Sequence, residues 1–477
     1  MQLLYKCIWI VGLFAVPSTG CKKFVQVGAP PTQLVTSSVF DNSATATAAL
    51  TGVYAQMANN GESYWMALNN GLLADEFMNY STDNQNIQLY TDEMTALVSP
   101  NTRWYAIYNY IYQANAVIEG LSNSGLNPAI QQQLTGEALF LRAFWLFCLT
   151  NMYGAIPLTT TTSYTTNATL SRSPQTAVYR QVIADLSQAQ NMLNSNYVNV
   201  SDTTITTERT RPTKWAASAL LARAYLFVKN YDSAEIEATA VINNTNLYSL
   251  CPNLNNVFLA NSTEAIWQLQ IPLPNSNVAT PDGQGFILIS APSTGTTNST
   301  AMSSEFLSAF EPGDNRLSNW IDSFSSGGGT FYFPYKYKVD NSSAASAPEY
   351  VMVLRLAEQF LIRAEAEAQL GDMADATNDL NTIRSRAGLG ASPTLTASAS
   401  LQQADSAILH ERQVELFTEW GHRWFDLVRM DSANFVLGSP GNVSQQKGGA
   451  WSSNSELYPI PQSEITADPN LSQNTGY

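Results

Sequence analysis

The chain contains 477 residues with a formal net charge of −15 at pH 7, and only 13% of its residues are charged. Typical domains carry about 25% charged residues, and proteins that bind nucleic acid cluster Lys and Arg against the phosphates. The acidic balance therefore argues against a nucleic-acid partner. A surface in which Asn, Ser, Thr and Gln replace charged residues suits a neutral, hydroxyl-rich ligand.

The N-terminus has the pattern of an export signal. Lys6 precedes an apolar run from Cys7 to Val16, which is shorter than the roughly 20 residues that span a bilayer. Small residues then lead to Cys21, as in the lipobox of bacterial lipoproteins, although Ser18 stands where that motif usually has an aliphatic residue. We expect a signal peptide at 1–20, a lipid on Cys21 and a tether at 21–42; a buried N-terminal helix is the alternative.

The main domain is predicted to begin at residue 43, where helical spacing of apolar residues starts. In residues 102–121, Trp104, Ile107 and Ile111 lie on one apolar helix face. Helices are expected over about 102–248 and 350–430.

Three stretches in these regions resemble one another, at 137–154, 217–243 and 358–384. Small residues such as Ala222 and Ala234 stand where the two helices of a tetratricopeptide repeat meet. The stretches are far apart, so the sequence predicts a scaffold of helix pairs with long excursions rather than a regular solenoid.

Two excursions, at 61–98 and 249–349, are rich in Gly, Asn, Ser, Thr and aromatic residues. Short strands are expected at 265–271 and 330–339, and a glycine turn between them at 327–329. Loops of this length in a compact domain are usually functional or disordered, and the aromatics and strands favour an ordered, functional, loop-rich region.

Residues 410–430, "HERQVELFTEWGHRWFDLVRM", contain both histidines of the chain among carboxylates and arginines. Read as one helix, the stretch offers ion pairs such as Glu419 with Arg423 and Asp426 with Arg429. His410 and His422 would lie roughly 18 Å apart on a straight helix and could not share a metal ion. A structural helix is therefore favoured over a metal or catalytic site, and no metal ligand and no catalytic residue are predicted.

Four stretches of the chain together resemble the SusD/RagB family of nutrient-binding outer-membrane lipoproteins of Bacteroidota. They are "TRWYAIYNYIYQAN" at 102–115, "LRAFWLFCLTNMYGAIPL" at 141–158, the 410–430 stretch, and "YPIPQSEITADPNLSQNTGY" at the C-terminus. The resemblance implies a mainly α fold of tetratricopeptide-like helix pairs. It also implies a lipid-anchored protein on the cell surface that captures a glycan and delivers it to a SusC-like TonB-dependent transporter. No catalysis and no cofactor are implied; some relatives hold a structural Ca²⁺, which is not predicted here.

Neutral glycans are held by aromatic faces and by a few polar groups that fix orientation. In relatives the site is built from the two excursions. The candidate ligand-binding residues are Tyr64, Trp65, Asn69, Asp75, Phe77, Tyr80, Tyr90, Trp320 and Tyr332. The tryptophans on helical apolar faces are expected in the core instead, namely Trp104, Trp145, Trp215, Trp420 and Trp424.

Three other functions stay open at this point. A secreted glycoside hydrolase would need a pair of carboxylates about 5–9.5 Å apart. With 38 acidic residues in the chain, pairs at this distance are inevitable, so such a pair would not by itself indicate a catalytic site. A peptide-binding member of the same family and a pure interaction scaffold of helical repeats are the other two.

Overall fold

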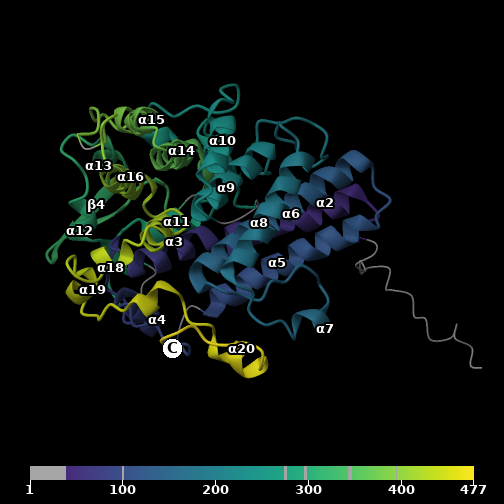
Figure 1. Ribbon diagram of the computed structural model, residues 1–477, viewed down its shortest axis with the longest axis horizontal. Coiled ribbons are helices and arrows are strands. Elements are labelled where there is room, and N and C mark those ends of the chain that lie inside the picture. Colours follow the sequence, from purple (N-terminus) through teal and green to yellow (C-terminus); the bar gives the residue numbers. More distant parts are fainter. Residues whose placement is uncertain (1–38, 99–100, 273–276, 295–297, 342–345, 394) are drawn as a thin grey trace, which may run out of the picture.

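The structure is a computed structural model that describes residues 39–98, 101–272, 277–294, 298–341, 346–393 and 395–477. It is mainly helical, with a few short strands, which confirms the predicted fold class (Figure 1). The predicted signal peptide, Cys21 and most of the tether lie outside the described residues. In the described part of the chain, every helix is too short or too polar to cross a bilayer.

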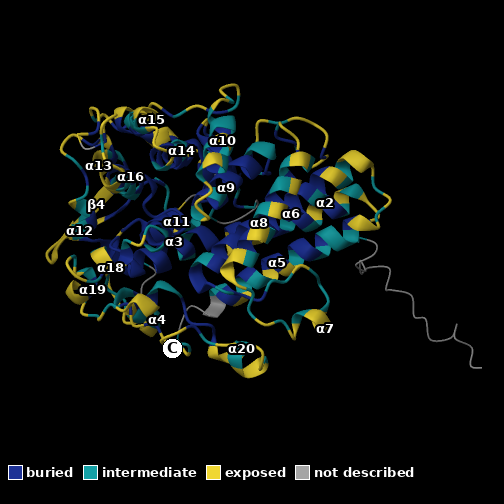
Figure 2. Ribbon diagram, in the orientation of Figure 1, coloured by how far each residue is buried: buried dark blue, intermediate teal, exposed yellow. Residues whose placement is uncertain are grey.

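Long helices form the scaffold, and most of them pack against the next one in the chain. Packed neighbours include α5 with α6, α6 with α8, α8 with α9, α9 with α10, α10 with α14 and α14 with α15. Their inward faces are buried and their outward faces exposed (Figure 2). The scaffold helices are α2 (Ser43–Asn59), α5 (Asn101–Ser122), α6 (Pro128–Tyr153), α8 (Gln175–Met192), α9 (Lys214–Phe227), α10 (Tyr231–Ile242), α14 (Leu356–Leu370), α15 (Met373–Arg386), α16 (Leu401–Leu416) and α17 (His422–Arg429).

The helix pairs that the sequence predicted are closed by short, well-capped turns. Gly371 ends α14 with a φ of 95°, a left-handed conformation that glycine adopts without strain, and Asp372 caps α15 through the Asp375 amide. Ala222 and Ala234 of the α9–α10 pair share one buried cluster with residues of α14. The small side chains let successive pairs stack closely although more than 110 residues separate them in sequence.

The excursions contain three antiparallel strand pairs. β1 (Phe77–Asn79) pairs with β3 (Thr300–Met302), β2 (Ala265–Leu269) with β6 (Val351–Arg355), and β4 (Ile321–Ser326) with β5 (Gly329–Pro334). Strands were therefore expected correctly around 265 and 330, and Gly327 and Gly328 form the hairpin turn. The short helices are α4 (Asn84–Tyr90), α7 (Tyr164–Asn167), α11 (Pro281–Phe286), α12 (Ser304–Leu307), α13 (Asn315–Trp320), α18 (Ala433–Val436), α19 (Val443–Gln446) and α20 (Gln462–Ala467), with 3₁₀ turns at Leu254–Asn256 and Ser453–Glu456.

The first excursion is less loop-like than predicted, because it contains α3 (Glu62–Leu73) as well as α4. Only Tyr64 and Trp65 of α3 are not buried. A helix that is buried on nearly all sides has no polar face and therefore lacks the period that marks an amphipathic helix. That is why the pattern of this segment was uninformative.

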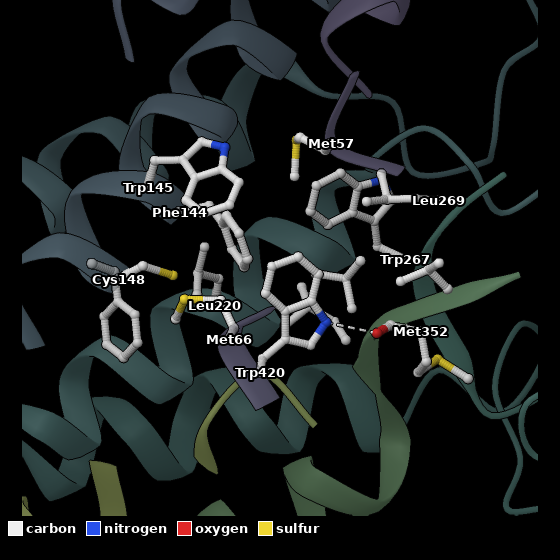
Figure 3. Packing of buried hydrophobic residues seen from close by; sticks show 14 of the residues in the cluster. Met57, Met66, Phe144, Trp145, Cys148, Leu220, Trp267, Leu269, Met352 and Trp420 are labelled. Carbon is white, nitrogen blue, oxygen red and sulfur yellow. Dashed lines mark hydrogen bonds between the residues drawn. The ribbon is translucent and has the colours of Figure 1, made fainter. Parts of the chain in front are cut away.

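The core joins the scaffold to the second excursion through large aromatic side chains. Trp267 of β2 meets Phe144 of α6 edge-to-face, with ring centres 5.8 Å apart, and Trp420 also packs on Phe144 (Figure 3). Trp420 Nε1 donates to the carbonyl of Met352 at 2.8 Å, which satisfies its buried polar group. The predicted core tryptophans are buried, except that Trp215 is only partly buried beneath Lys214.

The 410–430 stretch is not one helix, and this prediction was wrong. α16 ends at Leu416, and α17 starts at His422 after a turn in which Thr418, Trp420 and Gly421 all have positive φ. The break carries Glu419 away from Arg423, so the expected pair does not form. Of the two named pairs, only Asp426 with Arg429 is present, at 2.8 Å.

The turn instead places carboxylates in a buried ion-pair network. Glu419 binds Arg355 of β6 at 2.8 Å and Lys336 at 2.5 Å. The Lys336 ammonium also donates to the carbonyl oxygens of Glu415 and Phe417, each at 2.8 Å, and so caps the C-terminal end of α16. The polar residues of this stretch are therefore structural partners of the second excursion.

Candidate ligand-binding site

The two excursions meet in space, as the candidate site requires. β1 of the first pairs with β3 of the second in the register Phe77 to Met302. The Tyr80 amide donates to the Ser299 carbonyl at 2.8 Å, and Tyr80 packs edge-to-face on Phe331, with ring centres 5.6 Å apart. Segments more than 200 residues apart thus build one surface.

A pocket of about 500 Å³ opens where α2, α3 and α11 converge. We call it the amide pocket, because Asn and Gln side chains make up much of its lining. It is lined by Asn59, Asn60, Gly61, Tyr64, Trp65, Asn277, Pro281, Gln284, Gly285, Ile287, Ile289, Asn298, Asp340 and Asn341.

One wall is the turn between α2 and α3. Gly61 has a φ of 65° at this turn, and a Cβ there would come within 3.1 Å of Pro281. The turn places Tyr64 and Trp65, in the first helical turn of α3, beside the pocket. Arg103 holds Trp65 from one side, with the guanidinium 5.5 Å from the ring centre.

Buried Glu62 fixes this wall to α5. It accepts from Arg103 at 2.6 Å and from the Tyr110 hydroxyl at 2.9 Å. Burial outweighs these partners and raises the pKa of Glu62. Because the charge of Arg103 is already matched by Glu62, it contributes little free positive charge to the pocket.

The other wall is α11, which approaches α3 very closely. A Cβ on Gly285 would lie 2.1 Å from the Tyr64 ring, so only glycine fits there. Tyr64 packs on Phe286 with ring centres 4.9 Å apart. Ser63 Oγ donates to Asp282 Oδ2 at 2.5 Å, which ties the two walls together below the pocket.

The pocket is polar but nearly uncharged. Among its lining residues that the structure describes, Asp340 is the one charged side chain and neither Lys nor Arg occurs. Amide groups both donate and accept hydrogen bonds, so this lining matches hydroxyl groups and offers no counter-charge to a sulfate or carboxylate.

Comparison with known proteins agrees with the resemblance seen in the sequence. A model described as SusD family matches residues 159–477, and one described as starch-binding associating with outer membrane matches residues 24–226. This chain belongs to the SusD family.

Individual members of the SusD family align with it along most of their length. SusD-like protein P2 of Formosa agariphila is 27% identical, with 99% of each chain aligned. Starch-binding protein SusD of Bacteroides thetaiotaomicron is 26% identical over 86% of this chain and 84% of its own. A solved laminarin binding SusD-like protein superposes with a TM-score of 0.73 at 22% identity, over 91% of this chain and 99% of that one, which shows the shared fold.

Within this SusD-family chain, the predicted candidates fall into three groups. Tyr64 and Trp65 line the amide pocket. Tyr80 and Tyr90 are partly exposed and lie outside its lining; the Tyr90 hydroxyl contacts Met78 Sδ at 3.3 Å. Tyr332 is 42% exposed, but alternation along β5 puts it on the opposite face from Phe331 and hence from Tyr80.

The third group consists of four buried residues, and as ligand contacts these predictions were wrong. Asp75 is held by Arg423 at 2.6 and 2.8 Å, and Trp320 is fully buried with its Nε1 bound to the Leu254 carbonyl. Phe77 is stacked on Phe286 inside the fold. Asn69 is 2% exposed within α3. A side chain without exposed surface cannot stack on or bond to a ligand that arrives from solvent.

None of the six Asn and Gln residues that line the amide pocket was among the predicted candidates. Asn59 and Asn60 precede Gly61, and Gln284 lies in "PDGQG", so each stands beside a glycine that makes a close backbone approach. The position of these amides beside such glycines was the sequence signal that could have marked them as site residues. Among the described residues, no group of three or more His, Cys, Asp or Glu side chains is arranged to hold a metal ion.

Proposed function

We propose that this SusD-family chain binds a neutral oligo- or polysaccharide in the amide pocket. The observation that carries the proposal is the pairing of Tyr64 and Trp65 with a lining of amides and without a lining cation. Aromatic rings supply contact area against sugar C–H faces, and amides supply donors and acceptors for sugar hydroxyls.

The pocket is held in shape before any ligand arrives. Glu62 fixes α3 to α5, and the Ser63–Asp282 bond fixes α3 to α11. A preformed site loses less conformational entropy on binding than one that must order itself. This supports direct capture without rearrangement of the walls.

We further propose that the protein acts at the cell surface and passes its ligand to a SusC-like TonB-dependent transporter. The support is the family description, "associating with outer membrane", and the relatives named for binding starch and laminarin. A lipid on Cys21 would anchor the chain to the outer membrane. Copurification with a large outer-membrane barrel from the native membrane would test the partner.

Replacing Trp65 by Ala tests the binding site. We expect about a tenfold loss of affinity for the glycan that the wild type binds best, because one aromatic contact is lost. Affinity electrophoresis against laminarin, starch, xyloglucan and galactomannan, followed by titration calorimetry, measures the loss. Tyr164, which is 82% exposed on α7 and outside the pocket, provides the matched Tyr164→Ala control.

The outcomes separate this proposal from its alternatives. An unchanged affinity in Trp65→Ala at an unchanged melting temperature would place the site elsewhere. Release of reducing sugar by purified protein would indicate a glycoside hydrolase. Binding of peptides in the absence of any glycan binding would indicate a peptide-binding member of the family.

A further inference from the structure

A second cavity, of about 670 Å³, lies among α10, α14, α16, α17 and α18. It shares no residue with the lining of the amide pocket. We call it the α18 cavity. Its lining includes Tyr231, Gln369, Asp405, Gln413, Arg429 and Phe435.

The two arginines of this lining are already matched by carboxylates. Arg423 forms two hydrogen bonds with Asp75. Arg429 binds Glu365 and Asp426, with distances of 2.5 to 2.9 Å. Among the described lining residues, Lys229 is the remaining Lys or Arg side chain, so the α18 cavity, like the amide pocket, offers little positive charge to an anion.

Polar groups suited to hydroxyls face this cavity. Gln369 donates to Asp405 Oδ1 at 2.8 Å, which orients the carboxylate. Gln402 and Gln413 add two more amides from α16, and Gln413 is oriented by a 3.2 Å bond to Asp75. An oriented carboxylate among amides presents fixed acceptors and donors, the groups that fix a hydroxylated ligand.

An exposed aromatic residue stands beside these groups. Phe435 of α18 is 64% exposed, whereas Leu437, two residues later, is 1% exposed and anchors the segment in the core. Asn434 accepts from Trp451 Nε1 at 2.8 Å, and the Gly441 amide donates to the Phe435 carbonyl at 3.0 Å. The backbone that presents the ring is therefore held from both sides.

Tyr231, at the start of α10, supplies a second partly exposed aromatic ring from another element. The α18 cavity thus has the same combination as the amide pocket, with aromatic rings, amides and no unmatched arginine. We propose that it is a second binding site for a neutral glycan. This inference rests on the proposed function, because it takes the same class of ligand.

Two sites on one rigid chain would bind a polysaccharide more tightly than either site binds an oligosaccharide. Once one segment of a polymer is bound, the second meets its site at a high effective concentration. This gain in affinity requires a polysaccharide long enough to reach both sites. Short oligosaccharides should therefore bind the two sites independently.

Replacing Phe435 by Ala tests the second site in the full-length protein. With an oligosaccharide of the glycan that most retards the wild type on the panel named above, we expect equilibrium dialysis to count two molecules bound per wild-type chain. Phe435→Ala should weaken one of these binding events by about tenfold, and Trp65→Ala should weaken the other by a similar factor. On polysaccharide gels, Phe435→Ala should lose at least about tenfold in apparent affinity because the avidity is lost.

Asp405→Asn is the second variant, since it removes the carboxylate from a half-buried surface position without changing its shape. It should weaken the same binding event as Phe435→Ala, while Tyr164→Ala changes neither. One bound molecule per wild-type chain, weakened in Trp65→Ala and unaffected by Phe435→Ala and Asp405→Asn, would overturn the second site and leave the proposed function intact. No binding of any panel glycan by the wild type would overturn both.

Discussion

Asp282 is a buried carboxylate at the junction of the two walls of the amide pocket. Ser63 donates to it from α3, and Tyr64, Tyr337 and Glu419 face it from α3, from the segment after β5 and from the turn before α17. None of these groups is a cation. Because no positive charge among them offsets the cost of burying the carboxylate, burial raises the pKa of Asp282. The negative charge of Glu419 raises it further, to about 7.

Replacing Asp282 by Asn should make the protein more stable at alkaline pH. A carboxyl whose folded pKa is raised from 3.8 to about 7 stabilises the fold while protonated, and that contribution is lost as the pH rises through 7. The shift corresponds to at most about 4 kcal/mol, whereas Asn keeps an acceptor for Ser63 at every pH. The melting temperature of Asp282→Asn should exceed that of the wild type by a margin that grows between pH 5 and pH 8.

Asp282→Asn should also change how the glycan affinity depends on pH. Ionisation of Asp282 alters the bond that joins α3 to α11, so wild-type glycan affinity should change between pH 6 and pH 8. The affinity of Asp282→Asn should stay flat over that range. A parallel pH dependence in the two proteins would show that another group is responsible.

At the scale of elements, the contact between α3 and α11 sets the shape of the amide pocket. A Cβ on Gly285 would overlap the Tyr64 ring, so Gly285→Ala must push the ring or α11 aside. Overpacking of this kind costs about 1–3 kcal/mol, and we expect at least about a tenfold loss of glycan affinity. Gly52→Ala on α2 is the control, because a Cβ there meets nothing within 4 Å and a helical Ala is favoured. Equal affinities in the two variants would refute the role of this contact.

The helix pairs could be predicted from sequence because their signals are local. The αL glycine at 371 and the cap at Asp372 stand beside each other, and the small residues of α9 and α10 recur at the repeat spacing. The largely buried α3 and the break at Phe417–Gly421 could not be predicted in this way. Both depend on distant partners, since Gly421 packs against Asn70 of α3 and Glu419 turns towards Arg355.

The candidate site could be predicted only at the level of its regions. Aromatic composition pointed to Tyr64 and Trp65 but equally to Phe77 and Trp320, because composition cannot distinguish an exposed ring from a buried one. Asn60 and Gln284 can be recognised as site residues only in the structure, where the turn at Gly61 and α11 line the same pocket.

At the scale of the whole molecule, a buried ion-pair network joins the second excursion to the scaffold. Arg355 of β6 binds Glu264 before β2, Glu415 of α16 and Glu419 of the following turn, with distances of 2.6 to 3.0 Å. Burial alone would raise the pKa of Glu415, but three guanidinium groups lower it far below its ordinary value. Its stabilising contribution is thus present above about pH 4.5 and is lost as the pH falls below that value.

Replacing Arg355 by Met should destabilise the whole protein by about 3–5 kcal/mol, because three buried carboxylates lose their shared partner. Since the main core cluster contains residues of both excursions and of the scaffold, the loss should appear as one unfolding transition at a lower temperature, without a separate early step. Differential scanning calorimetry at pH 7 measures this, with the exposed Arg180→Met as a control expected to stay within about 0.5 kcal/mol of the wild type. A split transition in Arg355→Met would mean that the excursions fold apart from the helices and that the walls of the amide pocket are not held by the scaffold.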